Sequence, residues 1–234
     1  MRLSKSKIFS FKTCKYRFFM ENIKKWKGKK IPPQLKKGIE IHEMFEHAYD
    51  GAEYNNRTIV KNSLVKHKDY EKYKLDCDNF IDWEAKRNTP LFREIKFFDE
   101  ELNFSGVVDR IDIDKDGKIV LIDYKTGKGK KYISAYREEL AYYVYLFEKK
   151  ANRKIDKWGI FFSTSGRDLI EDVKREYIEK AKNKIKVVRL QIKECIDKNE
   201  WKKAKSGLCG WCSLYQNGAC EGEDNMFDEV KLKR

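Results

Sequence analysis

Two aspartates and a lysine occupy neighbouring segments whose residue patterns predict a β-hairpin. Asp109 lies in the first segment, Asp123 and Lys125 lie in the second, and both segments are rich in Val and Ile. Between them, residues 114–117 read Asp-Lys-Asp-Gly, which favours a type I turn followed by a glycine in the left-handed region. If Asp114 pairs with Lys118 across this loop, the register places Asp109 opposite Asp123. Lys125 then shares a face with Asp123, because side chains alternate along a strand.

Two carboxylates placed opposite each other need a compensating charge. Their Cβ atoms would be about 5 Å apart, and like charges at that distance destabilise a sheet. Asp109 also shares its face with apolar residues such as Ile111, so we expect it to be partly buried, where an unpaired carboxylate becomes neutral. A divalent cation held by both acids satisfies these requirements, and oxygen ligands suit Mg²⁺ or Mn²⁺. An ion pair with Lys125 is the alternative, although one lysine neutralises only one of the two acids.

His42 stands in a helical pattern, where a single histidine is more often a structural residue than a metal ligand. His47 follows five residues later. On a helix this spacing turns the two side chains about 140° away from a common face, so they cannot form the zinc-protease motif, whose histidines are four residues apart. The residues alone therefore leave the role of His42 open.

Four of the six cysteines are arranged as a metal-binding set. Cys209, Cys212 and Cys220 have the spacing C-x2-C-x7-C, and Cys14 supplies a fourth thiolate if the two ends of the chain meet. Four thiolates without further information favour structural zinc. Such a site would join the N- and C-terminal segments. Cys77 and Cys195 lie among apolar residues and are expected to be small buried side chains.

The elements that must position these residues alternate in type along the chain. Helical patterns cover 34–50, 60–87, 132–150 and 168–203, and strand patterns cover 93–98, 102–113, 118–125 and 157–163. This order predicts a mixed α/β fold in which helices flank a small central sheet. We expect one domain over residues 1–234, made of a basic segment (1–37), a core (38–165), and a long helix with a tail (166–234).

The positive charge is concentrated near the N-terminus. The chain has 52 Lys and Arg against 38 Asp and Glu, a net charge of +14. Residues 1–37 hold 11 lysines and two arginines against a single acid, Glu21, and so carry +12 of it. A local surplus of this size predicts a nucleic-acid partner. The lysines expected to contact phosphates are Lys24, Lys25, Lys27, Lys29 and Lys30.

The cellular compartment follows from the apolar pattern and the cysteines. No apolar run is long enough to span a bilayer, and the N-terminus lacks the apolar stretch of a secretory signal. Cysteines without such a signal indicate a reducing compartment. We therefore expect a cytoplasmic protein, in the host cytoplasm if it is viral, without a membrane partner.

Several motifs in this order resemble the PD-(D/E)XK nuclease superfamily, and its RecB-like exonuclease branch in particular. They are Gly106-Val-Val-Asp109, Asp123-Tyr-Lys125-Thr-Gly127, Gly38-Ile-Glu-Ile-His42, Glu94 before the first acidic strand, and Glu139-Leu-Ala-Tyr-Tyr143. The resemblance covers residues 4 to 222 and implies a restriction-endonuclease-like core. It further implies that His42, Asp109, Asp123 and the Tyr124 carbonyl bind the metal ion.

The same resemblance assigns catalytic roles. Lys125 would stabilise negative charge beside the metal-bound water, and Tyr143 and Glu139 would orient the substrate or Lys125. Glu139 departs from the glutamine of the family, because a carboxylate cannot donate an amide hydrogen bond and adds negative charge near phosphate. Its role stays open.

The cysteines take on a different meaning beside this core. One N-terminal and three C-terminal cysteines resemble the iron–sulfur exonucleases, which include the CRISPR-associated adaptation nuclease and phage or viral recombination enzymes. The resemblance implies a structural [4Fe–4S] cluster on Cys14, Cys209, Cys212 and Cys220, although Lys15 stands where the family has proline.

The expected function is thus a Mg²⁺- or Mn²⁺-dependent DNA exonuclease acting on single strands or ends, with recombination or CRISPR adaptation proteins as partners. The alternative is a non-catalytic, zinc-stabilised DNA-binding protein of the same fold. Glu139 is the feature that favours this alternative.

Overall fold

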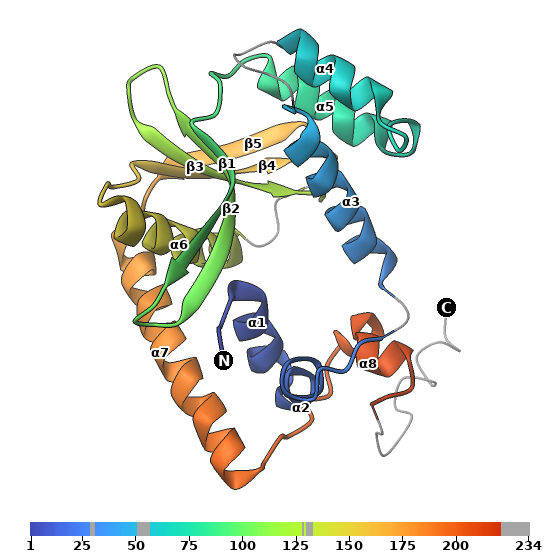
Figure 1. Cartoon of the computed structure of the whole chain (residues 1–234), viewed down its shortest axis with the longest axis vertical. Helices are drawn as coiled ribbons and strands as arrows, with labels where there is room; N and C mark the ends of the chain where they lie inside the picture. Colours follow the sequence, from blue (N-terminus) through green and yellow to red (C-terminus); the bar gives the residue numbers. More distant parts are fainter. Residues whose placement is uncertain (29–30, 51–56, 128, 130–132, 221–234) are drawn as a thin grey trace.

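The computed structural model describes residues 1–28, 31–50, 57–127, 129 and 133–220 (Figure 1). The helices are α1 (Lys5–Thr13), α2 (Lys15–Phe18), α3 (Pro33–His47), α4 (Arg57–Lys66), α5 (Lys74–Glu84), α6 (Ile133–Ala151), α7 (Arg175–Lys198) and α8 (Ser213–Gln216). The strands are β1 (Phe92–Asp99), β2 (Phe104–Ile113), β3 (Ile119–Lys125), β4 (Lys157–Phe162) and β5 (Arg167–Asp172). The predicted mixed α/β fold is confirmed.

The five strands form one sheet in the order β1-β2-β3-β4-β5. All neighbours are antiparallel except β3 and β4, which run parallel and are joined by α6. The hairpin between β2 and β3 has the predicted register, from Ile113 opposite Ile119 to Arg110 opposite Ile122. Its turn is also as predicted, because Gly117 has a φ of 76°. The next positions beyond this ladder are Asp109 and Asp123.

Helices cover both faces of the sheet. On one face α6 and α7 build a core with buried residues such as Leu121, Val144 and Ile185. On the other face α3, α4 and α5 build a second core around Phe45, Phe80 and residues of β3 and β4. Burial of these apolar surfaces is the main stabilising contribution and fixes the sheet between the helices.

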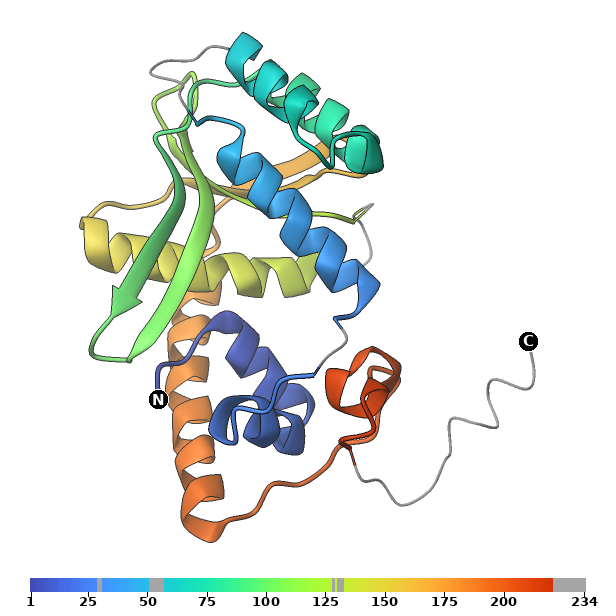
Figure 2. The same cartoon turned by 45° about the vertical axis from the view of Figure 1, so that its right-hand side comes forward.

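The N-terminal helices α1 and α2 lie beside α7, and the segment that follows α7 runs past them to α8 (Figures 1 and 2). The rings of Phe18 and Phe19 stack on Trp201, with centroids 6.3 and 4.9 Å apart. The backbone N–H of Tyr16 donates to the carbonyl of Lys202 at 3.2 Å. These contacts place the N-terminal helices next to the segment that follows α7.

Two of the expected helices are wrong in their extent. The segment expected over 60–87 divides into α4 and α5, separated by turns near His67. The segment expected over 168–203 begins with β5, which pairs with β4 at the edge of the sheet. The half-exposed β5 has no clear alternation of apolar residues, so only its pairing with β4 identifies it as a strand.

Two smaller expectations are also settled. Cys77 and Cys195 are buried, as predicted. No helix among the described residues is both long and apolar enough to cross a membrane.

Candidate active site

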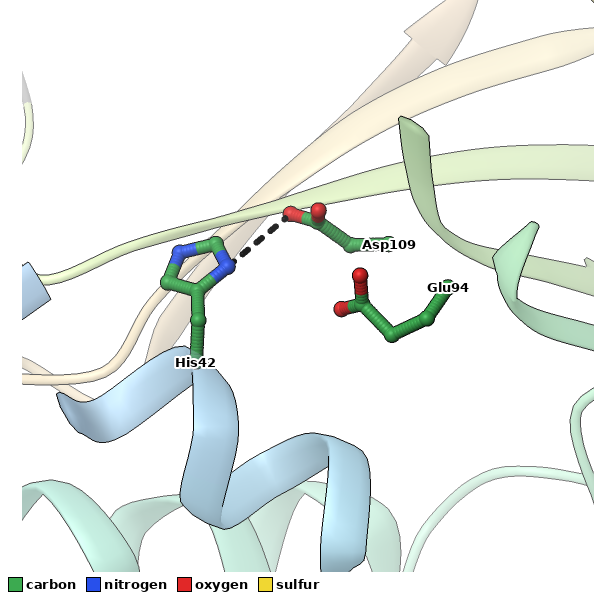
Figure 3. Close-up of side chains that lie close together, drawn as sticks. All are labelled: His42, Glu94 and Asp109. Carbon is green, nitrogen blue, oxygen red and sulfur yellow. Dashed lines mark ion pairs between the residues drawn. The ribbon is translucent and has the colours of Figure 1, made fainter. Parts of the chain in front are cut away.

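His42, Glu94 and Asp109 converge where α3 meets the β1–β2 hairpin (Figure 3). One ligand atom from each lies within 4.8 Å of the others. His42 Nδ1 is 3.7 Å from Asp109 Oδ2, and His42 Nε2 is 3.0 Å from the carbonyl oxygen of Tyr124. Because a carbonyl only accepts, Nε2 carries the hydrogen and donates it. The lone pair of Nδ1 then points toward the carboxylates, as a metal ligand requires.

Asp109 and Glu94 face each other where the regular alternation of side chains along β2 is interrupted. Val108 packs in the core beside α6, whereas Arg110, two residues later, is buried against Glu84 of α5. In a regular strand, side chains two residues apart point to the same face of the sheet. Val108 and Arg110 point to opposite faces, so the alternation of β2 is interrupted at Asp109.

The alternation of side chains in the partner strand β1 is interrupted opposite the same position. Ile95 packs on the α6 side, whereas the Arg93 guanidinium lies 4.2 Å from the centre of the Tyr49 ring on the α3 side. Glu94 between them has a φ of 46°, an unfavourable conformation for a residue other than glycine. This distortion turns the Glu94 carboxylate toward Asp109 and His42.

Burial and mutual repulsion perturb these acids. Desolvation, followed by repulsion from Asp109, raises the pKa of Glu94 to about 8. Desolvation, followed by the charge of Asp123, raises the pKa of Asp109 to about 6, although its Oδ2 accepts the Tyr124 N–H at 2.7 Å. Glu94 Oε1 is buried and has no hydrogen-bond partner among the described residues. Clustered carboxylates with an unsatisfied oxygen and an imidazole nitrogen fit a divalent cation such as Mg²⁺ or Mn²⁺.

Asp123 and Lys125 form the second half of the site. Lys125 Nζ lies 2.7 Å from Asp123 Oδ2 and 2.9 Å from Glu139 Oε2. Burial opposes the charge on Asp123, yet Lys125 and Lys5 hold the pKa of its carboxyl below the usual range. Desolvation likewise opposes the charge on Lys125, but Asp123 raises its pKa above the ordinary value. The lysine therefore stays protonated beside the carboxylates.

Lys5 is a site residue that the sequence reasoning missed. It comes from α1, and its Nζ lies 3.0 Å from Glu139 Oε2 and 5.2 Å from the centre of the Tyr143 ring. Desolvation alone would lower the pKa of Lys5, but Asp123 and Glu139 raise it. Glu139 therefore contacts two lysines and balances their charge, as a neutral glutamine at this position could not. Nothing in the sequence distinguishes Lys5 from the other lysines of the basic segment.

Gly106 and Tyr143 show how closely α6 approaches β2. A Cβ atom at Gly106 would lie 2.9 Å from Leu146 and 3.1 Å from Tyr143, so any larger residue there would force these two side chains to shift. Tyr143 is buried at this contact, and desolvation together with Asp123 raises the pKa of its hydroxyl. The glycine thus lets α6 bring Glu139 and Tyr143 to the acids of the sheet.

Arg110 anchors the strand immediately after Asp109. Its side chain is fully buried and pairs with Glu84, and its Nε lies 2.5 Å from Asp112 Oδ1. It also donates to the Tyr49 hydroxyl at 2.8 Å. Asp112 lies on the α5 face of the sheet, away from Asp123. Moving β2 away from α5 would separate these pairs and leave buried charges uncompensated. The network therefore fixes the position of β2 against α5.

The four clustered cysteines line one cavity of about 130 Å³ between the N- and C-terminal segments. Cys14 Sγ accepts the Arg17 N–H at 3.4 Å, and Cys209 Sγ accepts the Ser206 N–H at 3.3 Å. Around a single zinc ion, with Zn–S near 2.3 Å, the sulfur atoms would be about 3.8 Å apart. Within the described chain, no three of these sulfurs come within 4.8 Å of one another. The cavity thus brings four thiol groups together, and thiolates bind both zinc and iron–sulfur clusters.

The lysines predicted to contact DNA are only partly described. Lys24, Lys25 and Lys27 are exposed, with Lys24 Nζ 5.5 Å from the centre of the Phe19 ring. Lys29 and Lys30 lie outside the described residues.

Comparisons with known proteins agree with this geometry. Among curated proteins, none matches the sequence. The fold is similar to the crystal structure of the "Putative exonuclease" from Eubacterium rectale, with a TM-score of 0.57 and 10% sequence identity over 100% of this chain and 94% of the other. The family model of the PD-(D/E)XK nuclease superfamily matches residues 2–217. With the acids on β2 and β3 followed by Lys125, the chain belongs to the PD-(D/E)XK nuclease superfamily.

Proposed function

We propose that the protein is a metal-dependent DNA exonuclease that hydrolyses phosphodiester bonds at single strands or DNA ends. The observation that supports this most directly is the convergence of His42, Glu94 and Asp109 next to Asp123 and Lys125. Acids this close together are all ionised only when cations lie among them. Lys125 supplies one cation, and a divalent metal ion would supply the other.

His42 Nδ1 and the carboxylates of Glu94, Asp109 and Asp123 would hold the metal ion. When bound, Mg²⁺ or Mn²⁺ polarises a phosphate oxygen and lowers the pKa of a bound water. The Tyr124 carbonyl, predicted as a further ligand, accepts from His42 and thereby orients the imidazole. Its second lone pair leaves room for that role.

Lys125 would stabilise the charge that develops on the scissile phosphate. Its ammonium group is held by Asp123 and Glu139, so it is oriented before the substrate arrives. Glu139 and Lys5 together are positioning residues, because their ion pair restricts where Lys125 lies. Tyr143 lies under Lys5 and contributes packing at the same place.

We further propose that Cys14, Cys209, Cys212 and Cys220 hold a structural [4Fe–4S] cluster. Four thiolates around a cavity, with backbone N–H groups donating to two of the sulfurs, suit such a cluster. The non-catalytic zinc protein is less well supported. The lysine partners of Glu139 remove the feature that favoured lost activity.

The test of the nuclease uses end-labelled linear single strands, blunt duplexes and closed circular single strands, each with Mn²⁺, with Mg²⁺ or with chelator. We expect metal-dependent degradation of linear strands and intact circles. Asp123→Ala and Lys125→Ala should abolish cleavage without loss of DNA binding. The matched control is Asp116→Ala, in the exposed turn of the same hairpin, which should cleave normally. Full activity of Asp123→Ala would refute the proposed chemistry.

A separate measurement tests the cluster. Protein purified without oxygen should be brown, absorb broadly in the visible range and contain iron and sulfide. A colourless protein containing zinc would refute the cluster and leave the nuclease proposal untouched.

A further inference from the structure

A groove between the cysteine-rich end of the chain and the start of α3 is not used by the active site. Its volume is about 630 Å³. Two tryptophans and apolar residues line it together with positive charge, namely Trp26, Lys27, Ile31, Leu35 and Trp211. Figure 2 shows α3 starting beside α8 and running from there to the sheet.

Several large apolar side chains of the groove are exposed to solvent. Trp211 is 54% exposed, and Ile31 and Leu35 are each 55% exposed. Trp26 lies against the backbone of Gly28, where an added Cβ would be 2.9 Å from the indole ring. The backbone thus supports one indole, while the other stands in solvent. Aromatic faces held open in this way bind flat partners by stacking.

The charge around the groove selects an anionic partner. Lys27 lines it and is exposed, and Lys24 and Lys25 precede it in the same exposed segment. The acid in its lining, Glu21, is 2.9 Å from Arg17 Nε and also accepts from Ser213, so its charge is balanced. Flat aromatic faces beside lysines are the combination that binds unpaired nucleotides.

The direction of α3 connects the groove to the acids. Leu35, Ile39 and His42 are spaced four and three residues apart, so they lie along one side of the helix. Leu35 and Ile39 are both more than half exposed. From Leu35 to His42 the helix rises about 10 Å. An unpaired strand is more extended than the roughly 3.4 Å per nucleotide of a duplex strand, so that distance corresponds to about two or three nucleotides.

From this arrangement we infer that the groove is a stacking site for unpaired bases of a DNA strand whose phosphate lies at the acids about two or three nucleotides away. This inference rests on the proposed nuclease function and specifies it. Bases stack on Trp26 and Trp211, the sugar–phosphate backbone follows the exposed side of α3, and Lys27 contacts phosphate. A base-paired duplex hides its ring faces, so the groove selects single strands or frayed ends.

Binding measured in chelator tests the site without cleavage. The probe is fluorescently labelled oligo-dT of twelve nucleotides, followed by anisotropy, beside an abasic strand of equal length. Trp211→Ala and Trp26→Ala should each weaken binding of oligo-dT about tenfold. Neither should change binding of the abasic strand, because it has phosphates but no bases. Trp211→Phe should restore most of the affinity, since it keeps an aromatic face.

Leu35→Glu is the second variant, because Trp211 stands between two of the cysteines. It places a negative charge in the groove at an exposed position on α3, away from the cysteines in sequence. It should weaken oligo-dT binding as well. The matched control is Leu190→Glu, which makes the same substitution at a 68% exposed leucine of α7 and should leave oligo-dT binding unchanged.

The outcomes separate the two proposals. Wild-type affinity for oligo-dT in the tryptophan and Leu35 variants, with metal-dependent cleavage intact, would overturn the stacking site alone. Equal losses on the abasic strand would also overturn it, because the groove would then bind only phosphates. A wild-type protein that neither binds nor cleaves single strands would overturn the proposed function together with the stacking site.

Discussion

Glu94 offers a direct test of the metal site, because its carboxylate lies among other acids with one oxygen unsatisfied. Its pKa is about 8 in the folded protein, against an ordinary value of 4.5. Between these values the folded chain keeps a proton that the unfolded chain releases. In the metal-free protein, the contribution of Glu94 to the free energy of unfolding is therefore fully present below about pH 4.5 and is lost as the pH rises toward 8.

The size of this effect follows from the difference of about 3.5 between the two pKa values. At 1.36 kcal/mol for each pKa unit, the loss by pH 8 is roughly 5 kcal/mol at most. Solvent reaches part of the side chain, so we expect about 2–4 kcal/mol. Asp109, with a pKa of about 6 instead of 3.8, adds to the loss in the same direction.

A metal ion should reverse the trend, because it binds only deprotonated ligands. The stabilisation by Mn²⁺ should be small at about pH 5.5 and grow toward pH 8, as protons leave Glu94 and Asp109. Glu94→Gln removes the charge while keeping the shape. In chelator this variant should lose most of the decline in stability with pH, and it should bind Mn²⁺ more weakly.

Urea unfolding at these two pH values, with chelator and with Mn²⁺, measures the prediction. Glu100→Gln, at an exposed position just after β1, is the matched control and should behave as the wild type. A decline in stability with pH that is equal in wild type and Glu94→Gln would refute the reasoning about the buried carboxylate.

Three further predictions concern the residues around the site. Lys5→Ala and Glu139→Gln should each slow single-turnover cleavage, and their losses should not add in the double variant, because both act by orienting Lys125; additive losses would contradict the shared role. Replacing the three exposed lysines of the basic segment by glutamine should flatten the salt dependence of single-strand binding by about 0.7 for each phosphate contact, without slowing cleavage of bound DNA. An unchanged affinity would mean that this charge serves only solubility. Cys14→Ser should remove the bound iron and lower the free energy of unfolding by several kcal/mol, whereas Cys195→Ala should keep the iron; retention of iron by Cys14→Ser would exclude that thiol as a ligand. The lysines of the second prediction are Lys24, Lys25 and Lys27.

Local patterns in the sequence predicted the central hairpin well. The Asp-Lys-Asp-Gly loop sets the turn, the turn sets the register, and the register brings Asp109 and Asp123 next to each other. The cysteine spacing likewise predicted that the two ends of the chain meet, and the cysteines do line one cavity. The hairpin is encoded by residues that are close in sequence, and the cysteine cavity by a residue type that has few roles in proteins.

Half of the candidate site depended on packing that no local pattern encodes. Glu94 reaches Asp109 because the alternation of side chains is interrupted in both strands at the same position, which follows from how the hairpin fits between two cores. Lys5 reaches Glu139 across 134 positions of sequence because α1 packs against α7 in the core that α6 shares, and this lysine resembles many others in the same segment. The edge strand β5 was missed for a related reason, since its identity as a strand comes from β4.

The sequence by itself thus determined which acids, lysine and cysteines could do chemistry, because their types and spacing restrict what they can bind. The tertiary structure alone decided which further charges share the site and which surface lies next to it. It brings Lys5 and Glu94 to the acids and places Trp26 and Trp211 at the start of the helix that carries His42. The physical reason is that burial of two apolar cores, and not any local preference, sets how these distant segments meet.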